Sequence, residues 1–303
     1  MMTSMQDIVK KAQSFSTKTM VVAVANDHHV LEAVHMAKTA NIIHPILIGD
    51  EAKILQVFSD LNLMTDGYQI INCEDAVQTC REAVKLVSSH VGYFLMKGHV
   101  DSSIILKAAL DKEIGLRTQN RLSHVSVMEI PTYHKLLIMS DGAMNIDPNV
   151  DIKQEIIENG VIIAHAIGIQ NPKIGCLAAV EKVNPKMQAT LDAQELIRRN
   201  KAGIIQGCTI GGPFAMDNAI NKDAALHKGV KDPMAGDVDF ILMPQIESGN
   251  IFYKSMIFMA NAKGASIIAG AKRPIVLTSR ADSKNDKFYS IALGALVTEH
   301  SQS

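Results

Sequence analysis

The chain has 303 residues, of which 47% are hydrophobic and 20% are charged. This composition is typical of a globular protein with one large or two medium domains, and it excludes an intrinsically disordered chain. The formal net charge of −1 argues against nucleic acid or an anionic membrane as the main partner, but it is compatible with a local basic site for a small anion.

The cysteines and the apolar runs indicate a cytoplasmic protein. The four cysteines form no CxxC pair, and no histidine spacing completes a zinc ligand set, so we expect reduced thiols and no metal site. No N-terminal segment has the length of a signal-peptide core, and no apolar run approaches the roughly 18 residues of a membrane span. We therefore expect no membrane partner.

The first part of the chain alternates apolar strands with amphipathic helices. Strands are predicted at residues 19–25, 42–48, 68–71 and 93–96, and a helix follows each of them. Asp27 is predicted to cap the first of these helices. Such alternation is typical of a parallel, doubly wound sheet with right-handed crossovers.

The middle of the chain departs from this rhythm. Residues 125–130 and 135–139 predict two strands that lie too close in sequence for a crossover, so we expect them to pair antiparallel. Turn residues and a long helix after Asn149 follow. We place the domain boundaries here, with a first domain of residues 1–139 plus 287–303, a second of 140–286, and the active-site cleft between them.

The second half returns to the α/β pattern. Its expected elements, in order, are a strand at 174–179, a helix at 187–200, a strand at 204–207, a tight loop at 211–213, a strand at 238–243, a helix at 248–260, strands at 266–269 and 275–277, and a helix from residue 283. The last helix is expected to pack on the first domain. The predicted fold class is therefore two doubly wound α/β domains.

The end of the last predicted strand carries the sharpest functional signal. Ligands of open α/β sheets bind where strands end, and the helix that follows offers free N–H groups to an anion. Ser279 and Arg280 lie at this point, and arginine can grip a phosphate or carboxylate. A solvated loop with Arg280 in a surface ion pair fits the residues equally well. Asp286 has the capping-box spacing to Ser283, and capping alone is favoured over a role as general base.

Other polar segments give weaker signals. Residues 207–212 are glycine-rich but lack the Lys-Ser/Thr of a P-loop and the spacing GxGxxG, so a tight turn is favoured over a phosphate loop. Lys97-Gly98 at a strand end is a candidate anion contact. Asp217-Asn218 and residues 247–250 offer polar groups at predicted helix starts, and pure capping is the default interpretation of Glu247 and Ser248.

Longer motifs carry a family resemblance. They are the segments 121–126 (RLSHVS), 140–145 (SDGAMN), 212–219 (GPFAMDNA), 243–250 (MPQIESGN) with Tyr253-Lys254, and 270–283 (GAKRPIVLTSRADS). In these segments, and over nearly its whole length, the chain resembles the phosphate acetyl/butyryltransferase family, most closely the butyryl-transferring branch.

The resemblance implies a fold similar to that of isocitrate and isopropylmalate dehydrogenases. It implies acyl transfer between coenzyme A and inorganic phosphate, with butyryl-CoA and phosphate giving butyryl phosphate and CoA. CoA is then a substrate, no cofactor is needed, and the chain forms a homodimer or larger homo-oligomer. Ser279 and Arg280 match the active-site pair, and Asp286 matches the proposed base. The expected substrate-binding residues are Lys97, Gly98, Arg121, Asp217, Asn218, Glu247, Asn250, Lys254 and Asp282.

The first-domain arginines of acetyl-transferring relatives have no clear match. The chain offers Lys107 and Lys135 in those regions, and Arg117 or Arg121 as substitutes. The sequence also does not identify the preferred chain length of the acyl group. Acyl groups that differ by one methylene differ by only ~0.8 kcal/mol in burial free energy. A phosphate acetyltransferase, a dehydrogenase of the same fold and a non-catalytic acyl-CoA or phosphate-binding protein are the alternatives. The dehydrogenase would need an acidic metal set and a nucleotide fingerprint, and we find neither.

Overall fold

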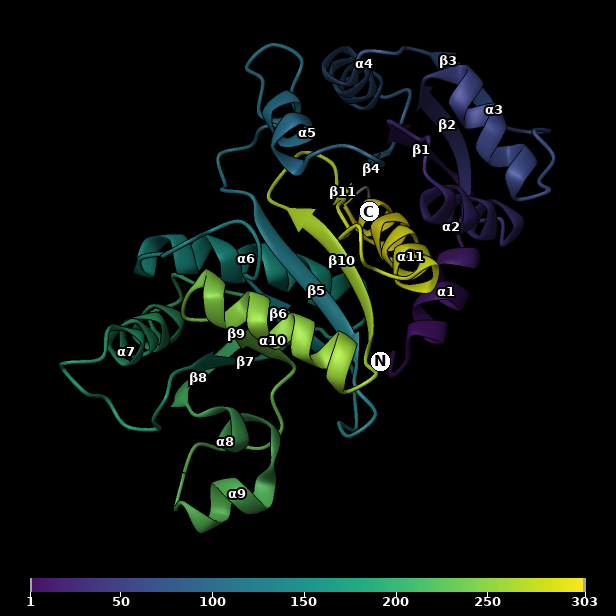
Figure 1. Cartoon of the computed structure of the whole chain (residues 1–303). Coiled ribbons are helices and arrows are strands. Elements are labelled where there is room, and N and C mark those ends of the chain that lie inside the picture. Colours follow the sequence, from purple (N-terminus) through teal and green to yellow (C-terminus); the bar gives the residue numbers. More distant parts are fainter. Residues whose placement is uncertain (1, 302–303) are drawn as a thin grey trace. The chain divides into compact units, whose positions relative to one another are not determined.

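The computed structural model describes residues 2–301 and divides into two compact α/β units (Figure 1). Unit 1 is Arg121–Gly264 with residues 2–4, and unit 2 is Met5–Asn120 with residues 265–301. The predicted boundaries differ from these: residues 121–139 join unit 1 and residues 265–286 join unit 2. Residues 1, 302 and 303 of the predicted first domain lie outside the described residues.

Unit 2 contains a sheet of the order β3-β2-β1-β4-β11-β10. All pairs up to β4–β11 are parallel, and β10 is antiparallel to β11. The strands are β1 (Lys18–Ala23), β2 (Ile43–Gly49), β3 (Gln69–Asn72), β4 (Phe94–Lys97), β10 (Lys263–Ala269) and β11 (Ile275–Val276). The helices are α1 (Met5–Gln13), α2 (His28–Thr39), α3 (Glu51–Asp60), α4 (Ala76–Ser88), α5 (Ser102–Ala109) and α11 (Lys284–His300).

The pairing of strand β11 with β4 explains why the segment 265–286 belongs to unit 2. In β11, Val276 is in register with Met96 of β4, so the loop after β11 lies at the edge where β4 ends. The helix that follows, α11, packs against α1 and α2 within the same unit (Figure 1). Asp27 caps α2 as predicted, because its side chain accepts the N–H of Val30 at 2.9 Å.

Unit 1 contains a sheet of the order β5-β6-β9-β7-β8. The pair β5–β6 is antiparallel, as predicted, and the other neighbours are parallel. The strands are β5 (Ser123–Glu129), β6 (Leu137–Ser140), β7 (Lys173–Leu177), β8 (Thr209–Phe214) and β9 (Phe240–Leu242). The helices are α6 (Val150–Ala166), α7 (Gln188–Lys201), α8 (Met216–Ile220), α9 (Lys222–His227) and α10 (Ile246–Met259).

Two predictions for unit 1 are wrong. Residues 204–207 lie before β8 rather than in a strand, and Gly211-Gly212-Pro213 lies within β8 rather than in a tight loop. A Cβ on Gly211 would stand 2.3 Å from Met234 Cε, so this glycine permits close packing instead of a turn. Pro213 is tolerated because β8 is the last strand in the order, where its missing N–H interrupts no ladder on the outer side.

The observed architecture is a mixed α/β fold, in which parallel strand pairs dominate in each unit. The interiors of the central strands are fully buried, as in Met20–Ala23 of β1 and Phe94–Met96 of β4, whereas the edge strand β3 has no buried residue. Across residues 2–301, the helices lack the combination of length and apolar character that a membrane crossing requires.

Candidate active site

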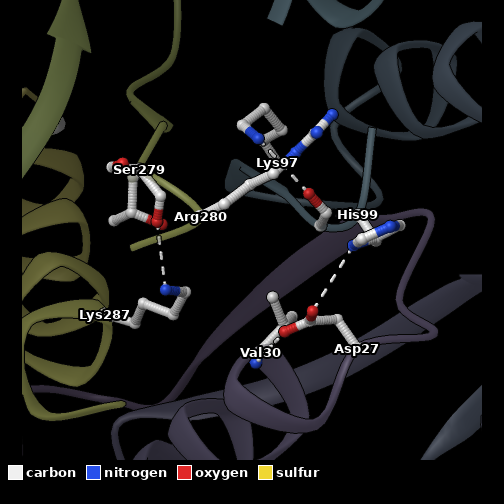
Figure 2. Close-up of a pocket in the computed structure, with 9 residues that line it drawn as sticks. Asp27, Val30, Lys97, His99, Ser279, Arg280 and Lys287 are labelled. Carbon is white, nitrogen blue, oxygen red and sulfur yellow. Dashed lines mark hydrogen bonds and ion pairs between the residues drawn. The ribbon is translucent and has the colours of Figure 1, made fainter. Parts of the chain in front are cut away.

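Three neighbouring parallel strands of unit 2 end at one edge of the sheet. These are β1, β4 and β11, so the residues that follow them in sequence come together. Figure 2 shows the pocket at this edge. It is lined by Asp27, Val30, Lys97, Gly98, His99, Thr278, Ser279, Arg280 and Lys287. The structure therefore brings together four predicted site residues: Lys97, Gly98, Ser279 and Arg280.

The pocket wall is mainly cationic. Lys97, Arg280 and Lys287 contribute three amine or guanidinium groups, and Asp27 contributes one carboxylate. The Asp27 carboxylate already accepts the Val30 N–H and lies 3.4 Å from His99 Nδ1 (Figure 2). The arrangement suits a small polyanion such as a phosphate.

Lys97 is the last residue of β4 and is buried. Its Nζ donates to the backbone oxygen of Val100 at 3.0 Å and of Gly98 at 3.4 Å. Burial lowers the pKa of Lys97, and the positive charges of Arg280 and Lys287 lower it further. A bound anion would offset both effects, so an anionic ligand is expected to raise this pKa.

Gly98 permits a close approach between the ends of β4 and β1. A Cβ at this position would lie 2.1 Å from the Val24 oxygen and 2.7 Å from the Ala23 oxygen. Both are backbone atoms, so a larger residue cannot be accommodated by a side-chain movement. This structural requirement accounts for the glycine without a direct ligand contact.

We expect Gly98→Ala to destabilise the protein by about 1–3 kcal/mol or more, the usual range for overpacking, because the backbone of β1 must move. Thermal or urea unfolding measures this. Gly264→Ala is the control, since its Cβ would meet Ile257 Cδ1 at 3.0 Å, the end of a flexible side chain. Equal stability of Gly98→Ala and the wild type would contradict the close approach.

Arg280 extends from the loop after β11 and meets Asp101. Its Nη2 lies 2.6 Å from Asp101 Oδ1, with 62% and 71% of the two side chains exposed. Exposed pairs of this kind contribute only about 0–1 kcal/mol. Asp101 occupies the N-cap position of α5 but makes no side-chain cap. The guanidinium is therefore held loosely, and an anion can displace the carboxylate.

The backbone of the loop 279–282 is fixed from within. Buried Asp282 accepts the Ser279 N–H through Oδ2 at 2.7 Å, and Lys287 Nζ donates to the carbonyl oxygens of Asp282 and Ser279. Burial raises the pKa of Asp282, and the Ser279 N–H opposes this shift. The predicted substrate-binding residue Asp282 thus shapes the loop that presents Ser279 and Arg280.

Asp286 forms the predicted capping box at the start of α11. Its Oδ2 accepts the Ser283 hydroxyl at 2.5 Å and the Ser283 N–H at 3.3 Å, while Ser283 Oγ accepts the Asp286 N–H at 3.1 Å. The residue is 8% exposed, and it does not belong to the set that lines the described pocket. The cap is confirmed, and a catalytic role stays a prediction.

The remaining predicted residues lie in unit 1, mostly at the carboxyl edge of its own sheet. Asp217 and Asn218 follow β8, and Glu247 and Asn250 lie in α10 directly after β9. Asn250 Nδ2 donates to the Gly142 oxygen at 3.0 Å, which fixes α10 to the turn after β6. The topology thus brings these residues to one edge, as it does in unit 2.

The side chains of these unit 1 residues differ in their ion pairs, hydrogen bonds and exposure. Asp217 forms an ion pair with Lys228 at 2.8 Å, whereas Asn218 is fully buried and both polar atoms of its side chain have no hydrogen-bond partner within the described part of the chain. Arg121 and Lys254 are exposed, and the Arg121 N–H donates to Glu155.

The basic residues proposed to replace the first-domain arginines of acetyl-transferring relatives lie in different surroundings. Lys135 lies in unit 1, where its Nζ is 2.6 Å from Asp239 Oδ1 and 3.0 Å from Asp237 Oδ1. Two carboxylates therefore pair with it, and its role in a phosphate or CoA contact stays a prediction. Lys107 and Arg117 are exposed in unit 2.

Sequence reasoning missed His99 and Lys287. One signal for Lys287 was available: it precedes Ile291 by four residues and Gly294 by seven, so it lies on the buried stripe of a predicted helix. A lysine on such a buried stripe needs hydrogen-bond acceptors or a negatively charged group near its ammonium group. His99 had no comparable signal. Among the described residues, no three histidine, cysteine or acidic side chains form a group that could hold a metal ion.

Comparison with known proteins gives a consistent result. A family model described as "Phosphate acetyl/butaryl transferase" matches residues 3–92 and 76–295. Phosphate butyryltransferase of Clostridium acetobutylicum is 42% identical over 297 residues, which are 98% of this chain and 99% of that protein. Phosphate acetyltransferase of Thermotoga maritima is 44% identical over 279 residues, or 92% and 95% of the two chains. The crystal structure of a branched-chain phosphotransacylase from Enterococcus faecalis V583 superposes with a TM-score of 0.84 at 32% identity and covers 94% of this chain and 100% of that one.

Proposed function

Because the chain belongs to the phosphate acetyl/butyryltransferase family, we propose that it is a phosphate butyryltransferase. It transfers a butyryl group between coenzyme A and inorganic phosphate, so that butyryl-CoA and phosphate give butyryl phosphate and CoA. The observation that carries this proposal is the cationic pocket of unit 2, where Ser279 and Arg280 lie beside Lys97 at the ends of adjacent parallel strands.

We propose the following chemistry, written from butyryl phosphate to butyryl-CoA. Asp286 accepts the proton of the CoA thiol, because a free thiol has a pKa near ~8.5 and is mostly protonated at neutral pH. The thiolate attacks the acyl carbon, a C–S bond forms, and the C–O bond to phosphate breaks. Phosphate leaves with the electron pair of that bond.

The pocket residues stabilise the charge that moves to the leaving phosphate. Arg280 binds the phosphoryl oxygens, and Ser279 donates a hydrogen bond to the carbonyl or phosphate oxygen. A preorganised donor to a developing oxyanion contributes roughly 3–4 kcal/mol, or about 10²–10³ in rate. The weak pair between Arg280 and Asp101 allows the exchange of carboxylate for phosphate.

A panel of acyl-CoAs with inorganic phosphate tests the proposal. CoA release, followed with a thiol reagent, is expected only when phosphate is present, and kcat/KM is expected to be highest for butyryl-CoA. The likeness to the T. maritima acetyltransferase makes acetyl-CoA the main competing substrate. A preference for acetyl-CoA would identify a phosphate acetyltransferase. CoA binding without phosphate-dependent release would instead favour a non-catalytic binding protein.

We further propose that the reaction needs no metal or organic cofactor, because the leaving phosphate is already a good leaving group. EDTA should therefore leave kcat unchanged. We also propose a cytoplasmic homo-oligomer, at least a dimer, which sedimentation can test. The two units are proposed to share the fold of isocitrate and isopropylmalate dehydrogenases, on the basis of the sequence resemblance.

A further inference from the structure

Lys287 is a buried cation without an ion-pair partner among the described residues. The residue is 3% exposed, and its Nζ donates to two neutral acceptors, the backbone oxygens of Asp282 at 2.6 Å and Ser279 at 3.1 Å. A lysine ammonium has three N–H donors, so the third has no hydrogen-bond partner within residues 2–301. Lys287 also forms no ion pair with a described carboxylate.

Such a group is costly unless something compensates for it. Burying a charge without a counter-charge is unfavourable, and an apolar side chain often serves the fold equally well at a buried ionic position. Burial lowers the pKa of Lys287, although the carboxylates of Asp282, Asp27 and Asp286 oppose the shift without forming an ion pair with it. Holding two carbonyl oxygens in place therefore does not by itself explain the positive charge.

The position of Lys287 indicates what the charge is for. Lys287 lines the same pocket as Lys97 and Arg280, and the positive charge of Lys287 contributes to the lowered pKa of Lys97 (Figure 2). These three cations outnumber Asp27, the one carboxylate that lines the pocket, so their mutual repulsion falls when an anion enters. The pocket is thus organised for a ligand with more than one negative charge, such as the phosphate dianion.

We propose that Lys287 binds the phosphate group of the substrate through its third N–H, while the other two hold the loop 279–282 that presents Ser279 and Arg280. This inference rests on the proposed function and adds to it a phosphate-binding residue that lies outside the Ser279-Arg280 pair. One ammonium group thereby couples the shape of the loop to the presence of its ligand.

Lys287→Met removes the charge and keeps most of the aliphatic side chain. We expect it to raise KM for phosphate about 10- to 100-fold, the range for one hydrogen bond to a charged group. Lys287→Arg should restore part of the affinity. Lys284→Met is the matched control on the same helix, because Lys284 is half exposed and pairs with Glu32 at 2.8 Å. It should leave KM unchanged.

A role in folding alone would give a different pattern. Loss of folded protein lowers kcat in proportion to the active fraction and leaves KM for phosphate unchanged. A Lys287→Met variant with normal KM would therefore overturn the proposal. If this variant does not fold, Lys287→Gln carries the same test, because it removes the charge but keeps a donor. A folded Lys287→Gln variant with a normal KM for phosphate would also overturn the proposal.

Two measurements do not depend on turnover. Calorimetric titration with inorganic phosphate should show Kd raised by the same factor in Lys287→Met. Amide hydrogen exchange should show faster exchange at Ser279 and Asp282, whose N–H groups are bonded within the loop. A wild-type protein that binds phosphate but never releases CoA would refute the proposed function and leave this inference standing. Unchanged phosphate affinity in Lys287→Met, with active wild type, would refute only the inference.

Discussion

Replacing Arg280 with alanine is expected to lower kcat by at least about 10², because the developing charge on the leaving phosphate loses its guanidinium. Folding should survive, since the arginine side chain is 62% exposed and its pair with Asp101 contributes only about 0–1 kcal/mol. Steady-state kinetics with butyryl-CoA and phosphate, together with a melting curve, measure the two effects separately.

Two further variants sharpen the interpretation of this result. Arg280→Lys keeps the charge but loses the planar fork, so we expect only partial recovery of kcat. Arg273→Ala is the control, because Arg273 precedes β11 at the opposite end of the strand and bonds to His90. It should leave kcat unchanged. Arg280→Ala with wild-type kcat would place Arg280 in a surface ion pair only.

Asp286→Asn is expected to lower kcat by at least about 10² with little loss of stability. Asparagine can still accept the Ser283 hydroxyl hydrogen bond, so the cap of α11 is largely kept, but it cannot accept the thiol proton. Kinetics and thermal unfolding of the same preparation separate the two roles. Near-normal turnover would leave Asp286 with the capping role alone.

Ser283→Ala is the matched control, because it removes the cap and keeps the carboxylate. Loss of an N-cap hydroxyl typically costs ~1 kcal/mol of stability, so the melting temperature should fall by a few degrees while kcat changes much less than in Asp286→Asn. If the two variants lose activity equally, the shape of the helix start, and not a proton acceptor, governs turnover.

Much of the unit 2 site was predictable because its determinants are local. The cap at Asp27, the strand end at Lys97 and the segment Thr278–Arg280 each follow from a short pattern of apolar run, polar residues and helix start. Since parallel strands end at one edge, these segments had to meet if their strands were neighbours. The capping box of Ser283 and Asp286 follows equally from its spacing.

The errors arose where a residue type has more than one physical use. Gly211-Gly212-Pro213 has the composition of a turn, yet it is a strand in which the absence of a side chain lets Met234 approach. Lys135 is a candidate ligand contact by sequence position, and the structure shows only that it also pairs with Asp237 and Asp239. Only the packing of distant segments distinguishes these uses.

The sequence by itself determined the class of fold, the family, and the pair Ser279-Arg280 at a strand end, because periodicity and motifs are properties of short stretches of chain. The tertiary structure decided which strands are neighbours, and hence that residues 265–286 complete the sheet that holds Lys97. It also decided that Lys287 is buried against the loop 279–282. Burial and charge clustering depend on contacts between segments far apart in sequence, which no local pattern encodes.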